Sequence, residues 1–361
     1  MRVQSSMFAP RFRALLPVVL ALFGAAAPAQ PAAPGLPSVT INAQANRDPV
    51  EKSYRRMLRG MDLFERRHGL APAAQLRFRL LPRHRDTDMS AIRVDVVGSN
   101  VETRVPVDAD NTFVLQRDRA AADENAQVVP NRRRQTMTWR SEIRTPGLAP
   151  QTRRLGDLRL ECEVGMEAGL ISNQRSLLDR LLGALADTPA YCHRKDPRYL
   201  FFSEQPLFGV TLVAGARREM LPAARLYAGV SEDPADRDEL RYCDCEVMLD
   251  RSYFLPLDDE SWPDDTLVLF EPMTGSDDVG AGACTDAVGC VIPGRSTRAD
   301  LASAYPNATV VRFDSGYEVW VDRDKPDRRD RRDASLAERV MLVDPSGVLT
   351  KSRLRLPPAN R

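Results

Sequence analysis

Short stretches in which apolar and charged residues alternate constrain the fold of this chain more than any other feature. In the segments 76–80 and 92–96, apolar residues occupy every second position and Arg or Asp lies between them. This period of two places the apolar side chains on one face of an extended strand. The polar tetrad 108–111 provides a turn between two further strand candidates. We therefore predict an antiparallel, β-sandwich-like domain over residues 75–170.

The segments around this domain predict a β-rich, multi-domain chain. Apolar residues spaced three and four apart predict an amphipathic helix within 49–70, which packs on a sheet or, as an alternative, docks a partner. Residues 158–164 alternate like a further strand, and a helical connector is expected over 171–198. A second β unit is predicted at 199–273 from four strand candidates, which are 210–213, 242–249, 253–255 and 266–270.

The C-terminal residues 291–356 predict a small α+β module that follows a linker over 274–290. Thr297 suits a helix N-cap, and Asp300 stands three residues later, as in a capping box. The helix is followed by strand candidates separated by turns that contain Gly316 and Gly347.

Three motifs of this module resemble one known family. They are Pro293-Gly294-Arg295-Ser296-Thr297 before the helix, the strand from Gly316 to Trp320, and the final hairpin from Val343 to Leu349. Their order resembles the SmpA/OmlA (BamE-like) family of outer-membrane assembly accessory proteins. The resemblance implies a small α+β fold that binds protein partners and carries no catalytic residues. We include Tyr317 and Trp320 in a candidate interaction surface.

The chain departs from this family in two respects, and a second segment resembles another family. The family's members are usually small lipoproteins, whereas this chain has no lipobox and places a long region before the module. Within the segment 92–116, residues 105–115 resemble a step in transthyretin-like, carboxypeptidase-regulatory-type domains, with Asn111 where those domains usually have Gly.

Residues 1–29 have the pattern of a secretory signal peptide. Arg11 and Arg13 precede a short apolar run over 14–27, and the small residues Ala27 and Ala29 predict cleavage before Gln30. An uncleaved inner-membrane anchor is the alternative, although the run is short for a membrane span. We expect a periplasmic protein with a mobile linker at 30–48. After cleavage it would not span the membrane, and peripheral membrane association is left open.

The cysteines fit export to an oxidising compartment. There are six, an even number, at Cys162, Cys192, Cys243, Cys245, Cys284 and Cys290. Cys284 and Cys290 enclose a short loop and are predicted to pair with each other. Cys243 and Cys245 are predicted to pair with Cys162 and Cys192. A metal site built from Cys192, His193, Cys243 and Cys245 is the alternative, but this spacing is not that of a zinc site.

Two charged segments are candidate binding regions. The stretch 132–159 is rich in arginine and includes the candidate surface residues Trp139, Arg140, Arg144, Arg153 and Arg154. It predicts either an anion or lipid-headgroup patch, or a solvated loop with arginine stacked on Trp139, which we favour. The acidic loop 258–265 contains Asp258, Asp259 and Asp264. It predicts a calcium site, a pair of hydrolase carboxylates or, our preferred interpretation, an acidic surface loop.

Charge and motifs narrow the class of function. The chain has 51 Lys and Arg against 50 Asp and Glu, so no global basic surface for nucleic acid is expected. No nucleophile elbow, HExxH, P-loop or GxGxxG motif occurs. We expect a non-catalytic envelope protein without cofactor or metal that binds a protein partner or supports an envelope assembly. The alternatives are a periplasmic hydrolase using the 258–265 carboxylates and a binder of anionic ligands or lipids using 132–159.

Overall fold

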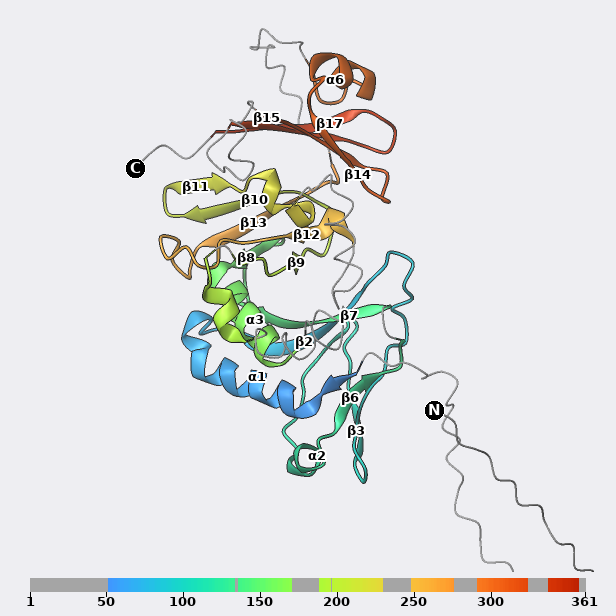
Figure 1. Ribbon diagram of the computed structural model, residues 1–361, viewed down its shortest axis with the longest axis vertical. Helices are drawn as coiled ribbons and strands as arrows, with labels where there is room; N and C mark the ends of the chain where they lie inside the picture. The colour runs from blue at the N-terminus through green and yellow to red at the C-terminus, as the bar shows by residue number, and fades with distance from the viewer. Residues whose placement is uncertain are drawn as a thin grey trace, which may run out of the picture. The chain divides into compact units, whose positions relative to one another are not determined.

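The computed structural model is rich in β-strands, and every strand pair among the residues it describes is antiparallel (Figure 1). These residues are 51–133, 136–170, 188–195, 197–229, 248–275, 291–323 and 337–356. The predicted β-rich, antiparallel class is therefore confirmed. The predicted signal peptide, its linker and the cysteines at 243, 245, 284 and 290 lie outside the described residues. No helix in the described part of the chain is long and apolar enough to cross a membrane.

Two sheets form the N-terminal part of the described chain. One has the strand order β1 (Lys52–Ser53), β6 (Gln127–Pro130), β3 (Val94–Val97) and β4 (Glu102–Val105). The other has the order β5 (Thr112–Phe113), β2 (Gln75–Pro82) and β7 (Met137–Arg144). A short helix, α2 (Arg119–Asp123), is capped by Asp118. Apolar side chains of both sheets, which include Phe78, Phe113, Trp139, Val94 and Val128, share one core.

The first helix packs on these sheets, as its apolar stripe predicts. It is α1 (Tyr54–Arg67), and it begins after Ser53, whose hydroxyl caps the backbone N–H of Arg56. Tyr54 and Met57 are buried in the shared core. A 3-10 turn, η1 (His68–Leu70), follows the helix.

A second group of strands lies next in the chain. A four-stranded sheet has the order β11 (Arg217–Met220), β10 (Leu207–Ala214), β13 (Leu267–Pro272) and β8 (Thr152–Arg154). Two short strands, β9 (Phe201–Phe202) and β12 (Ser252–Tyr253), pair with each other. Four 3-10 turns occur nearby, which are η2 (Pro189–His193), η3 (Ala223–Arg225), η4 (Tyr227–Gly229) and η5 (Leu249–Arg251). Since β8 pairs with β13, this sheet combines a strand from the predicted 75–170 range with strands from 199–273.

The strand predicted at 158–164 is wrong, because the segment belongs to the helix α3 (Leu155–Glu167). This helix is buried on two sides. Leu158 and Cys162, one helical turn apart, join the core of the second sheet, whereas Leu160 and Val164 join a cluster beside β7. Two apolar stripes on opposite sides of a helix place an apolar residue at every second position, which imitates the period of a strand.

The predicted cysteine pairing is also corrected. Cys162 on α3 and Cys192 in η2 form a disulfide with each other, so neither pairs with Cys243 or Cys245. The bond joins two segments 30 residues apart in sequence, and both of its cysteines are buried.

The C-terminal module has the predicted order of elements. The helix α6 (Arg298–Ala304) is capped by Thr297 and Asp300 in a capping box. It precedes a four-stranded meander of β14 (Thr309–Arg312), β15 (Glu318–Arg323), β16 (Glu338–Val343) and β17 (Leu349–Arg355). Gly316 and Gly347 have positive φ angles at the turns, a backbone conformation that glycine adopts without steric cost.

Both faces of this meander are covered. On one face Trp320 and Met341 pack with Leu301 of α6. On the other face the side chains of β15 and β16 join the core of the second sheet, and Glu338 accepts a hydrogen bond from the backbone N–H of Ala223 at 2.7 Å. Trp320 is buried and donates its indole N–H to Glu318, so its predicted place on an exposed interaction surface is wrong. Tyr317 is half-buried and packs against the core of the second sheet.

Candidate functional site

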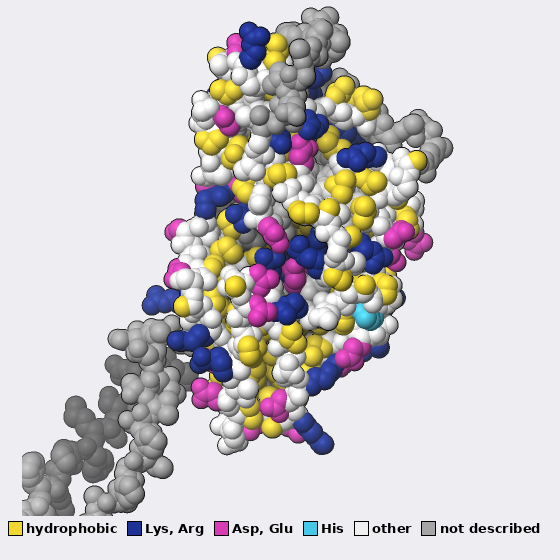
Figure 2. All heavy atoms as spheres, turned by 180° about the vertical axis from the view of Figure 1, so that it is seen from behind, with side chains coloured by type: hydrophobic (Ala, Val, Ile, Leu, Met, Phe, Trp, Pro, Cys, Tyr) yellow, Lys and Arg dark blue, Asp and Glu magenta, His cyan; other side chains and the backbone are white. Residues whose placement is uncertain are grey.

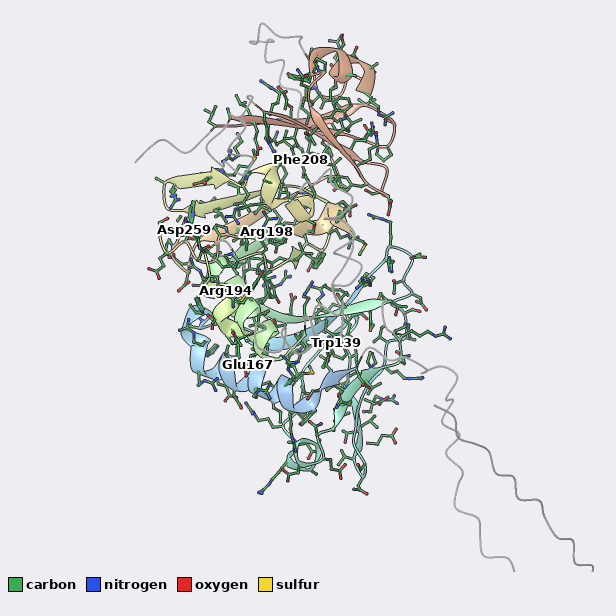
Figure 3. The ribbon with its side chains drawn as sticks, viewed as in Figure 1. Trp139, Glu167, Arg194, Arg198, Phe208 and Asp259 are labelled. Carbon is green, nitrogen blue, oxygen red and sulfur yellow. A yellow bond between two sulfur atoms is a disulfide. The ribbon has the colours of Figure 1, made fainter. Side chains whose placement is uncertain are left out.

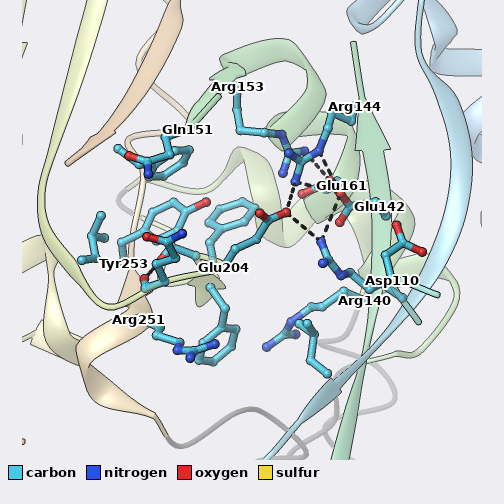
Figure 4. Close-up of a pocket in the computed structure, with 18 of the residues that line it drawn as sticks. Asp110, Arg140, Glu142, Arg144, Gln151, Arg153, Glu161, Glu204, Arg251 and Tyr253 are labelled. Atoms are coloured by element: carbon cyan, nitrogen blue, oxygen red, sulfur yellow. Dashed lines mark hydrogen bonds and ion pairs between the residues drawn. The ribbon is translucent and has the colours of Figure 1, made fainter. Parts of the chain in front are cut away.

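A pocket of about 290 Å³ lies between the strands β2 and β7 and the strands of the second group (Figure 4). Charged residues of both signs line it. The basic residues are Arg79, Arg140, Arg144, Arg153 and Arg251, and the acidic residues are Asp110, Glu142, Glu161 and Glu204. Aromatic side chains from β9, β12 and β13 and their flanks form much of the remaining wall, and they are Tyr199, Phe201, Phe202, Tyr253 and Phe270.

Strand geometry explains how the arginines of β2 and β7 reach this pocket. Successive side chains of a strand point to opposite faces of the sheet. On β7, Trp139 and Ile143 therefore enter the apolar cores, whereas Arg140, Glu142 and Arg144 line the pocket.

The pairing of the two strands sets arginine opposite arginine. Arg79 on β2 is the direct cross-strand partner of Arg140 on β7. Like charges placed opposite each other on one sheet face destabilise the pairing unless other groups compensate them.

Carboxylates compensate Arg79 and its neighbour Arg144. Arg79 lies 3.2 Å from Glu204 and 3.6 Å from Glu142. Arg144 contacts the same two carboxylates, at 3.1 Å and 3.0 Å. Although burial raises the pKa of Glu142, the cations of Arg153, Arg79 and Arg144 outweigh it and lower the pKa below its ordinary value. Two arginines and two carboxylates thus form a neutral network at one side of the pocket.

Arg153 and Glu161 form a second, deeper ion pair. The guanidinium of Arg153 donates to Glu161 at 2.5 Å and to the carbonyl oxygen of Ile143 at 2.7 Å. Glu161, on α3, also accepts the backbone N–H of Ile143 at 2.7 Å. Burial and the nearby charge of Glu142 raise the pKa of Glu161 to about 7, in spite of the opposing effect of Arg153.

Arg140 is the cation that this arrangement leaves unmatched. Its side chain is buried, with 7% of the residue exposed. All three guanidinium nitrogens are covered, and none has an acceptor with hydrogen-bond geometry among the described residues, although the Tyr199 hydroxyl interacts with the guanidinium. The guanidinium carbon lies 4.8 Å from the ring centre of Phe202 and 6.0 Å from that of Tyr199. Aromatic faces attract a cation, but they do not satisfy its N–H groups.

Two further groups surround Arg140. Burial raises the pKa of Tyr199 to about 12, although the nearby cation of Arg140 opposes the shift, so the phenol is neutral at physiological pH. Arg251 enters from the side opposite Arg140 (Figure 4), and its Nε is also buried with no acceptor in the described part of the chain.

The arginine-rich stretch therefore divides between the pocket and other contacts. Arg140, Arg144 and Arg153 meet in the pocket. Arg154 points to Thr145 and Asp157, while Arg159 binds Asp264 at 2.6 Å and the carbonyl oxygens of Leu257 and Asp259.

The preferred prediction of a solvated loop with arginine stacked on Trp139 is wrong. Trp139 is fully buried in the core of the N-terminal sheets, so it is not part of an exposed surface either (Figure 3). Arg140 points away from that core because neighbouring residues of a strand face opposite sides, and it stacks on Phe202 instead.

The acidic loop 258–265 contributes no residue to this pocket. Its Trp262 is buried beneath the guanidinium of Arg217, 3.4 Å away, and Asp264 is engaged by Arg159. No cluster of three metal-binding side chains occurs within the described ranges. On the face seen in Figure 2, basic and acidic side chains are interspersed rather than gathered in a patch of one sign.

Several residues of the site were missed by the sequence reasoning. Arg79 and Glu142 could have been identified, because each belongs to a strand in which every second residue of the non-core face is charged. No sequence pattern identifies Phe202, Glu204 and Arg251, because they lie in short strands and turns that are distant in sequence from β2 and β7. Comparison with protein-family models, curated proteins and solved structures finds no match for this chain.

Proposed function

We propose that this protein is a non-catalytic binding protein that takes a small anionic ligand in the pocket between β7 and β9. The observation that carries this proposal is Arg140, a buried arginine without an acceptor among the described residues. Burying an unpaired charge costs on the order of 3–5 kcal/mol. A chain retains such a group where a bound anion satisfies it, because the anion then gains hydrogen bonds in a water-poor site.

The other charges of the pocket support binding rather than chemistry. Arg79 and Arg144 are held by Glu142 and Glu204, and Arg153 is held by Glu161. Glu142 and Glu204, which each contact both Arg79 and Arg144, position these arginines and are poorly available as a nucleophile or base. The paired arginines form a fixed frame, and Arg140 is the group in that frame that a ligand can neutralise.

A thermal-shift and calorimetric screen of small anions tests the proposal. Wild-type protein is titrated with chloride, acetate, benzoate and inorganic phosphate, beside Arg140→Gln. Arg119→Gln is a matched control, because the Arg119 side chain is 95% exposed and lies outside the pocket. We expect at least one anion to bind wild type and the control but not Arg140→Gln. Equal binding by all three proteins, or no binding by any, would refute the proposal.

We further propose that the protein is exported through residues 1–29 and works in the periplasm. The Cys162–Cys192 disulfide supports this location, because disulfides form and persist in oxidising compartments. Cell fractionation and the intact mass of the purified protein provide the test. A mass that includes residues 1–29, together with recovery in the cytoplasm, would contradict it.

A second candidate function is binding of an envelope protein partner through the C-terminal module. One observation favours it, which is that β17 is an edge strand and carries Leu354 with 55% of its surface exposed. The unpaired backbone groups of an edge strand can pair with a strand of another chain, and an exposed leucine on that edge can add an apolar contact. Crosslinking in cells, comparing wild type with Leu354→Lys and with Val114→Lys as the control, tests it. Capture of the same envelope proteins by all three would exclude this edge.

A further inference from the structure

We infer that the ligand is an aromatic monocarboxylate, with its carboxylate on Arg140 and its ring against the aromatic wall of the pocket. This inference rests on the proposed anion-binding function and names the class of anion. Three properties of the pocket carry it, which are its charge balance, the geometry of the guanidinium and the composition of its wall.

The charge balance favours one negative charge. The ion pairs of the pocket match three of its arginines with three carboxylates, and the remaining charged residues of its lining are Arg140, Arg251 and Asp110. With all four carboxylates ionised, the net excess is therefore a single positive charge. A dianion such as phosphate would exceed it and would face the carboxylates of Glu142 and Glu204 in the same small space. Like charges at such distances repel strongly where water is scarce.

The geometry of Arg140 favours a flat acceptor. Its guanidinium lies over the ring of Phe202, so its planar face is occupied and its N–H groups remain to be satisfied. Those N–H groups form a planar fork that matches the two oxygens of a carboxylate. Because the three nitrogens are covered, a carboxylate reaches them only after a side chain moves. Phe202, which is half-buried and stacked on the guanidinium, is the side chain placed to do so.

The wall favours an aromatic body. Phe201 stacks on Tyr253 with ring centres 5.5 Å apart, and Tyr253 contacts Phe270 at 5.1 Å. Phe270 is half-buried and lines the pocket, so a ligand in the pocket can contact its ring. Aromatic rings prefer such partners over aliphatic groups, and the pocket volume of about 290 Å³ suits a small ring system.

The experiment compares benzoate, 2-naphthoate, acetate and inorganic phosphate by calorimetry on the full mature chain at neutral pH. We expect the two aromatic acids to bind at least about tenfold tighter than acetate and than phosphate. Phe270→Leu should weaken binding of benzoate about two- to tenfold and leave that of acetate unchanged. Phe64→Leu is the control, because Phe64 is a half-buried ring on α1 outside the pocket.

The outcomes separate this inference from the function on which it rests. If phosphate or acetate binds as tightly as benzoate and still requires Arg140, the aromatic monocarboxylate is wrong and the anion site stands. If Phe270→Leu and Phe64→Leu bind benzoate equally, the ring placement is wrong. If no anion depends on Arg140, the anion site itself is wrong.

Discussion

Replacing Arg140 by methionine should make the protein more stable, although the substitution removes a residue from the centre of the proposed site. The guanidinium is buried, has no acceptor among the described residues and stands directly across from Arg79. Methionine retains most of the aliphatic volume of the arginine stem and adapts to irregular gaps. The change therefore removes a buried charge without leaving a large cavity.

The structure gives the size of the effect. The substitution abolishes the stacking of Arg140 on Phe202 at 4.8 Å and on Tyr199 at 6.0 Å, which together stabilise the fold by about 1–2 kcal/mol. It also removes the desolvation cost of the cation, on the order of several kcal/mol, and the repulsion from Arg79. We expect Arg140→Met to raise the free energy of unfolding by about 1–3 kcal/mol.

Urea unfolding followed by circular dichroism measures this difference at neutral pH. Arg119→Met is the control, because its exposed ion pair with Asp123 contributes less than about 1 kcal/mol. A loss of more than about 1 kcal/mol in Arg140→Met would mean that the protein itself satisfies the guanidinium. The argument for a ligand at Arg140 would then fail.

Three further predictions concern the surroundings of the pocket. The pKa of Glu161 is raised to about 7 in the folded chain from an ordinary value of 4.5, so the free energy of unfolding should fall as the pH rises between these values. Glu161→Gln should reduce that fall by about 1–3 kcal/mol. Parallel plots of unfolding free energy against pH for wild type and Glu161→Gln would contradict this. Loss of the disulfide in the double variant Cys162→Ala and Cys192→Ala should cost about 3–4 kcal/mol for a loop of 30 residues, as measured by denaturation with and without reductant. Gly156→Ala should lower stability by about 1–3 kcal/mol, because its methyl group would collide with the carbonyl oxygen of Leu70, and an unchanged melting temperature would refute that packing.

The helix and strands between residues 298 and 355 could be predicted from the sequence because their signals are local. The capping box at Thr297 and Asp300 fixes the start of α6 within four residues. Gly316 and Gly347 mark turns that join adjacent strands of a meander. Such a unit requires no knowledge of distant segments to place its elements.

The helix α3 could not be predicted in the same way because its environment is not local. Leu158 and Leu160 are both buried, but in different clusters that are built from different parts of the chain. A period of two is then compatible with a strand or with a helix buried on two sides, and the sequence alone does not distinguish them. The pairing of Cys162 with Cys192 was missed for a related reason, since the helix brings Cys162 close to η2.

The candidate site shows both outcomes within one strand. The alternation of residues along β7 explains why Arg140 and Arg144 share a face, although a solvated loop was the preferred prediction for this stretch. It does not predict which face is buried, or that Phe202 covers Arg140 from a segment some 60 residues later. Anion binding by the arginine-rich stretch was accordingly only the alternative prediction, and its form as an enclosed pocket was not predicted.

The division of β7 into two faces also explains how a costly group can be retained in this fold. Trp139 and Ile143 anchor the strand in two apolar cores, so its backbone position is fixed without any contribution from Arg140. The ion pairs of Arg79 and Arg144 hold the rest of the pocket face, and the rings of Phe202 and Tyr199 lie against the Arg140 guanidinium. A ligand that binds there displaces Phe202 but need not order the surrounding charges first, and preorganised charges raise affinity by lowering the entropic cost of binding. A smaller side chain at Trp139 or Ile143 should therefore weaken anion binding, although neither residue lines the pocket. This result distinguishes a preorganised site from one that its ligand assembles.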